Sequence, residues 1–205
     1  MEPNGPNDSL SGIVIRNCTA KENYGGGFTV SFSGLSNSSK PLDVAFEGCT
    51  VDGAGCGSGF SAQTWHKSGS APKGSSVSWT GGWITNTKNP GLQFSVPALA
   101  VQVDVSDLQL GPRTAYGSAG RGWPTISIAP ERHNDLHRPI GGVHFRNVTV
   151  VDDEARAFLS VAANATCDSG TFAVENPHGC FSKPAVSRES STANFTWTCN
   201  KSGDN

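Results

Sequence analysis

Apolar and polar residues alternate in five segments of the chain, and each segment is followed by a second, shorter one. Alternation of this kind predicts β-strands with one buried face, and its recurrence predicts a repeat protein. The longer segments are GIVIRNCTA (12–20), LDVAFEGCTV (42–51), SVSWTGGWI (76–84), VQVDVSDLQL (101–110) and GVHFRNVTV (142–150). The shorter ones are GFTV (27–30), GFSA (59–62), GLQF (91–94), TISI (125–128) and FLSV (158–161).

Aligning these units produces columns that predict which side chains point inward. Among the inward positions only Gly82 is not apolar, whereas the interleaved positions contain only Val14, Ala45 and Trp83 as apolar residues. A further column predicts a bend in every coil, because its members tolerate left-handed backbone or hydrogen-bond a turn locally. The inward columns begin at Ile13, Ile15, Cys18, Ala20, Phe28 and Val30, and the bend column is Asn17, Gly48, Gly81, Asp107 and Asn147.

The same pattern continues more weakly toward the C-terminus. In GTFAVENPHG we expect Phe172 and Val174 to point inward and Asn176 to form the turn. The sequence therefore predicts an all-β solenoid of about six coils, with parallel strands over residues 1–180. Residues 181–205 are predicted to be irregular, with a last strand at 194–198.

The repeat resembles the right-handed parallel β-helix repeats of the pectate-lyase-like superfamily. The segments IRNCTAKENYGGGFTV, FEGCTVDGAGCGSGF and FRNVTVVDD resemble the family pattern I-x-F-x-N-C-T-V followed by G-G-x-G-F, and the likeness covers about residues 2–179. MEPNGPN also aligns with ISIAPERHN, which places Met1 in the column of Ile128. From this alignment we expect the chain to be an N-terminally truncated part of a longer solenoid; a short but complete solenoid is the alternative.

Composition excludes several classes of protein. Charged residues make up 16% of the chain and the net charge is -2, so there is no basic field to attract nucleic acid. No apolar run approaches the roughly 20 residues of a membrane span. Six cysteines and several N-x-S/T sequons fit an extracellular or cell-surface glycoprotein, although no signal peptide is present. Asn37 and Asn164 are the glycosylation candidates, and Cys167 with Cys180 is the expected disulfide. Cys18 and Cys49 are expected in the same inward column, one coil apart. They form either a second disulfide or two buried free thiols.

Candidate chemistry lies on the outer face of the first strands, because a filled solenoid has no internal pocket. Asp104, His144 and Arg146 are expected to emerge together there and are the candidate catalytic residues. A ladder of solvated charges is the alternative. The candidate substrate-binding residues are Trp65, His66, Lys67, Arg132 and Glu47.

The resemblance implies that this face and its loops bind an extracellular polysaccharide. In a lyase, Arg146 would neutralise a uronate, His144 or Lys67 would act as base, and Asp104 would orient His144 or bind Ca²⁺. In a glycosidase, Asp104 and Glu47 would be the two carboxylates. Trp65 or Trp83 would stack on a sugar ring. No cofactor is certain, and the spacing of His133 and His137 is weak evidence for a metal site. The alternatives are a non-catalytic glycan-binding or cell-surface rod, and a scaffold whose catalytic coils lie elsewhere.

Overall fold

A computed structural model of the chain is all-β and describes residues 1, 5, 7–64, 71–96, 100–116, 123–129, 142–152, 154, 156–162, 165, 169–175, 185–186 and 194–200. The first nine strands are β1 (Ile13–Arg16), β2 (Thr19–Asn23), β3 (Phe28–Ser31), β4 (Asp43–Glu47), β5 (Thr50–Ala54), β6 (Phe60–Gln63), β7 (Ser75–Thr80), β8 (Trp83–Thr87) and β9 (Leu92–Ser95). The others are β10 (Val101–Ser106), β11 (Gln109–Leu110), β12 (Ile126–Ile128), β13 (Val143–Arg146), β14 (Val148–Val151), β15 (Leu159–Val161), β16 (Ser169–Glu175), β17 (Ala185–Val186) and β18 (Asn194–Asn200).

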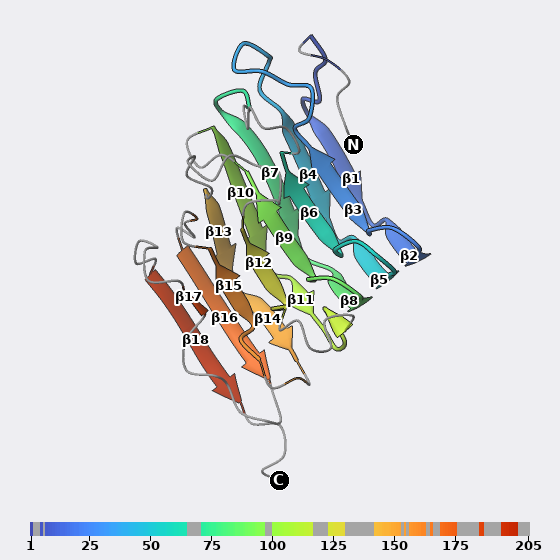
Figure 1. The fold of residues 1–205 in the computed structure, drawn as a ribbon, viewed down its shortest axis with the longest axis vertical. Coiled ribbons are helices and arrows are strands. Elements are labelled where there is room, and N and C mark those ends of the chain that lie inside the picture. The colour runs from blue at the N-terminus through green and yellow to red at the C-terminus, as the bar shows by residue number, and fades with distance from the viewer. Residues whose placement is uncertain are drawn as a thin grey trace.

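Equivalent strands of successive coils lie side by side and are all parallel (Figure 1). Strands β1, β4, β7, β10, β13 and β16 form one half of a 12-stranded sheet, and β14, β11, β8, β5 and β2 form its other half. Strands β3, β6, β9, β12, β15 and β17 form a separate sheet of six. The predicted right-handed parallel β-helix of stacked coils is therefore confirmed.

The predicted bend occurs in each of the first five coils. Asn17, Gly48, Gly81, Asp107 and Asn147 have positive φ angles of 51°, 60°, 70°, 55° and 53°. The bends of the fourth and fifth coils also bond through their side chains, since Asn147 Nδ2 donates to Asp107 Oδ1 at 2.9 Å. The bend turns the chain from one half of the large sheet into the other.

The inward columns form the core as predicted, except at the first coil. Val44, Val77, Val103 and Val143 stack in register and are buried. Phe46 and Trp79 stack with ring centroids 5.3 Å apart. Cys18, predicted to point inward, is exposed, and Ile13, Ile15 and Phe28 are only partly buried. In the described structure this coil is covered by a neighbouring coil on one side only.

The sixth coil differs from the prediction in its register. Strand β16 runs without a break alongside both β13 and β14, and Phe172 and Val174 pair with Val148 and Val150. Both side chains are buried, as expected. Thr171, inside this strand, lies beside the bend residue of the fifth coil, and its Oγ1 accepts a hydrogen bond from Asn147 N at 2.7 Å. Asn176, predicted to form this turn, lies outside the described residues.

Both ends of the described chain join the sheets. Met1 N donates to Thr29 O at 2.7 Å and Ser31 N donates to Met1 O at 2.9 Å, which places Met1 beside Val30. Val30 is in the column of Ile128, so Met1 lies where the alignment put it. At the other end β17 pairs with β15, and β18 pairs with β16. The segment predicted to be irregular therefore contributes two strands, including the one expected at 194–198.

Cys18 and Cys49 are free thiols, so the bond considered between them is not formed; Cys56 is free as well. Cys199 is disulfide-bonded, which the sequence did not predict. Cys167 and Cys180, the expected disulfide pair, lie outside the described residues. Asn37 is exposed in a turn, whereas Asn164 lies outside the described residues. The described part of the chain contains no helix with the length and apolarity of a transmembrane span.

Candidate functional site

The predicted catalytic residues lie on neighbouring strands. Asp104 on β10 and His144 on β13 are register partners, and Arg146 is the partner of Ser106. Their side chains bond to different groups: Gln102 Nε2 donates to Asp104 Oδ2 at 2.8 Å, and His144 Nδ1 lies 3.2 Å from Ser169 Oγ. Arg146 Nη2 lies 3.5 Å from Asp107 Oδ2, in an exposed ion pair. The prediction that these side chains share a face agrees with this register.

Glu47, the predicted substrate-binding residue on this face, lies on β4, two coils from Asp104. It pairs with Arg16, whose Nε is 2.5 Å from Glu47 Oε2. This hydrogen bond lowers the pKa of Glu47 and raises the pKa of Arg16. Trp65, His66, Lys67 and Arg132 lie outside the described residues, as do His133 and His137. Within the described ranges no three His, Cys, Asp or Glu side chains gather closely enough to hold a metal ion.

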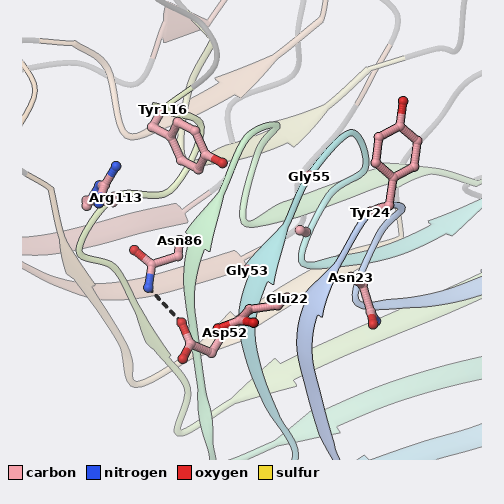
Figure 2. A pocket seen from close by; sticks show the side chains of 10 residues that line it. Glu22, Asn23, Tyr24, Asp52, Gly53, Gly55, Asn86, Arg113 and Tyr116 are labelled. Carbon is pink, nitrogen blue, oxygen red and sulfur yellow. Dashed lines mark hydrogen bonds between the residues drawn. The ribbon is translucent and has the colours of Figure 1, made fainter.

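A groove of about 420 Å³ lies elsewhere, where β2, β5 and β8 end (Figure 2). It crosses the first four coils, which corresponds to roughly 14 Å along the axis at about 4.8 Å per coil. A smaller hollow of about 290 Å³ lies beside β16 and β18, and none of the described residues that line it is charged. The groove is lined by Glu22, Asn23, Tyr24, Asp52, Gly53, Ala54, Gly55, Asn86, Arg113 and Tyr116.

A second bend shapes the floor of the groove. Glu22, Gly53, Asn86 and Arg113, one from each coil, have positive φ angles of 52°, 96°, 54° and 62°. A side chain at Gly53 would begin 3.1 Å from the backbone of Glu22, so glycine allows the two coils to approach closely. In the first three coils this column lies near the ends of β2, β5 and β8, where the strand pairing skips the bend and resumes one residue later. The side chains around it line the groove. Only Gly53 and Asn86 are of types that favour this conformation, which is why the sequence pattern did not reveal the bend.

The groove combines polar groups with exposed aromatic rings. Asn86 Nδ2 donates to Asp52 Oδ1 at 2.6 Å on the floor, near Glu22 (Figure 2). Tyr24 is 88% exposed and comes from the first coil, whereas Tyr116 is 42% exposed and comes from the fourth. The Arg113 guanidinium lies 5.3 Å from the centre of the Tyr116 ring. Two aromatic side chains therefore stand at the ends of a floor made of carboxylates and an amide.

A buried ion pair holds the wall that carries Tyr116. The side chains of Arg156 and Asp152 are only 9% and 2% exposed, and Arg156 Nε lies 3.0 Å from Asp152 Oδ2. Arg156 Nη1 donates to Ala115 O at 3.2 Å and to Trp123 O at 3.0 Å. The pair thus ties the fifth coil to both ends of the insertion in the fourth. Neither charged residue lies in a repeating column, so the sequence pattern gave no signal for the pair.

Comparison with family models, with curated proteins and with solved structures finds no match for this chain. The site is therefore interpreted from its own geometry.

Proposed function

We propose that this chain binds an extracellular polysaccharide in the groove between Tyr24 and Tyr116. The observation that carries the proposal is the placement of two exposed aromatic rings at the ends of a polar floor. The faces of sugar rings are apolar and pack on aromatic side chains, while sugar hydroxyls hydrogen-bond to carboxylates and amides. Ligand sites commonly combine such rings with a few oriented polar groups.

The charge of the groove favours a neutral glycan over a polyuronate. Glu22 and Asp52 contribute two carboxylates, whereas Arg113 is the one cation among the described side chains that line the groove, and it lies against the Tyr116 ring. A chain of uronates would bring further negative charge toward these carboxylates, and like charges at short range repel. This preference differs from the uronate-binding role expected for Arg146 on the other face.

Binding of neutral glycans tests the proposal directly. We would titrate the protein with soluble polymers of glucose, xylose and N-acetylglucosamine, and with polygalacturonate, by isothermal calorimetry. We expect at least one neutral polymer to bind and polygalacturonate to bind more weakly. Replacing Tyr24 and Tyr116 together by Ala should weaken binding at least about tenfold, which is the effect of losing an aromatic anchor.

The matched control is the double variant Tyr24→Phe and Tyr116→Phe, which retains both rings. It should keep most of the affinity, because stacking uses the ring and not the hydroxyl. If no neutral polymer binds the parent, or if the Ala and Phe variants bind equally well, the proposal is wrong.

A second candidate function is polysaccharide cleavage on the face of β10 and β13. The register pairing of Asp104 with His144, with Arg146 two residues further along β13, favours it. A lyase reaction creates an unsaturated product that absorbs ultraviolet light, so uronate polymers can be screened by absorbance. Equal activity of the parent, His144→Ala and Arg146→Ala would eliminate this site, and activity lost in both variants would support it.

A further inference from the structure

Trp83 is an exposed aromatic residue outside the groove. It begins β8 and is 39% exposed, in contrast to the buried Trp79 four residues earlier. Its register partners on the neighbouring strands are Thr50 and Gln109. Thr19 and Thr149 extend the row, so the indole is the one aromatic side chain in a row of hydroxyls and amides. The core does not use this ring.

The next outward position along β8 leads from Trp83 to the groove. Thr85 lies two residues further along β8, about 6.6 Å away at the rise of a strand, and it pairs with Asp52. Asp52 lines the groove and accepts the hydrogen bond from Asn86. Thr85 Oγ1 donates to Pro112 O, directly before Arg113. Trp83 therefore lies roughly 8 Å from Asp52 by strand spacing, on the same outward side of the sheet.

The exposed aromatic residues of the described chain gather around this one region. Among the side chains that the structure describes, they are Tyr24, Trp83 and Tyr116. Tyr24 and Tyr116 belong to the groove, which leaves Trp83 as a third ring beside it. The side chains that flank Trp83 in its row carry no charge, which suits the hydroxyl groups of a neutral sugar.

We propose that Trp83 is a second sugar-binding platform and that the ligand is an oligosaccharide chain. One part of the chain occupies the groove between Tyr24 and Tyr116, and its continuation crosses the outer face of β8 and stacks on Trp83. Thr50 and Gln109 bond to the hydroxyls at the edge of that sugar. This inference rests on the proposed function of the groove and adds to it that binding strength depends on chain length.

A series of oligomers of one to six sugar units tests the inference. The probes are neutral oligomers of glucose, of xylose and of N-acetylglucosamine, titrated by isothermal calorimetry. For the parent we expect affinity to rise with length within the series that binds. Trp83→Ala should weaken binding of the hexamer about tenfold, as for loss of an aromatic anchor, and leave the shortest oligomer that binds unchanged.

Two variants accompany the test. Trp83→Phe keeps an aromatic ring and should retain most of the hexamer affinity, and Val14→Ala alters an exposed apolar residue of β1 and should change nothing. If the parent binds hexamer and short oligomers equally, or if Trp83→Ala binds the hexamer like the parent, the inference is overturned while the groove proposal stands. If the parent binds no member of any series, both are wrong.

Discussion

Gly82 occupies a position where a residue with a side chain would have a strained backbone and would also clash with a neighbouring coil. Its φ is +78°, and a Cβ there would lie 1.9 Å from the carbonyl oxygen of Cys49 on the coil below. Gly81 has the similar φ of +70°, but its Cβ would lie 3.9 Å from the nearest atom. Substituting Gly81 therefore tests backbone strain alone, whereas substituting Gly82 tests the same strain together with a steric clash between coils.

We expect Gly82→Ala to lower the free energy of unfolding by more than about 3 kcal/mol, since the strained conformation and the clash add. Gly81→Ala should cost only about 1 kcal/mol from the left-handed backbone. Urea unfolding of both variants measures the difference. Equal losses would show that the coils separate easily and that the clash is relieved at no cost.

The exposed Arg16–Glu47 pair predicts a local pH effect. Because the hydrogen bond from Arg16 lowers the pKa of Glu47, the stability from this pair is present above the ordinary glutamate pKa and is lost as pH falls through the lowered value. An NMR titration of Glu47 should give a midpoint below that of an unperturbed glutamate, and Arg16→Ala should restore the ordinary midpoint. An unchanged midpoint in the variant would mean that the pair does not persist in solution.

At the scale of elements, buried side chains hold the described part of the insertion after β11. Arg156 pairs with Asp152 and also donates to the backbone carbonyls of residues 114, 115 and 123. Thr125 Oγ1 donates to Asp152 Oδ2 at 2.7 Å. The segment carries Arg113 and Tyr116, so this buried pair positions one end of the groove.

Removing one partner leaves the other charge buried, which typically costs about 3–5 kcal/mol. We expect Asp152→Ala to lose this much stability and also to weaken glycan binding, because the wall that carries Tyr116 is released. Combining it with Arg156→Met should recover part of the stability, since no buried charge remains, but should not recover binding. If the double variant binds like the parent, the pair does not position the groove.

The strands and their register were predictable because apolar and polar residues alternate along each strand. The column from Ile13 to Val143 and the pairing of Asp104 with His144 follow from a repeat of apolar residues, because register is specified wherever one face is buried. The groove gave no such signal. Glu22 and Arg113 have positive φ although their residue types disfavour it, and the Asp152–Arg156 contact lies outside the repeating columns. The second bend recurs once in each of the first four coils but shares no residue type, so neither feature could be recognised from the sequence.

In the described part of the molecule, the strands of each coil pair only with strands of the coils beside it. Among the described strands, β1 pairs with β4 alone and β18 with β16 alone, whereas β7 is bonded on both sides by β4 and β10. The aromatic contacts of the core reach further, since Trp79 of the third coil touches Phe28 of the first coil as well as Phe46 and Phe60 of the second. In a solenoid of this kind stability is close to a sum of coil and interface terms, so it is not uniform along the axis.

Amide hydrogen exchange should therefore be slowest in β7–β9 and should quicken toward β1 and toward β18. The disulfide at Cys199 adds a constraint at the β18 end, while Cys18, Cys49 and Cys56 are free thiols. A disulfide stabilises largely by restricting the unfolded chain, so reduction with a thiol reagent should speed exchange in β18 and leave β1 unchanged. Mass spectrometry of the exchanging protein, with and without reductant, measures both effects. Uniform protection along the axis would instead mean that the coils unfold as one cooperative unit, and a reductant effect at β1 would mean that the bond acts through the whole stack.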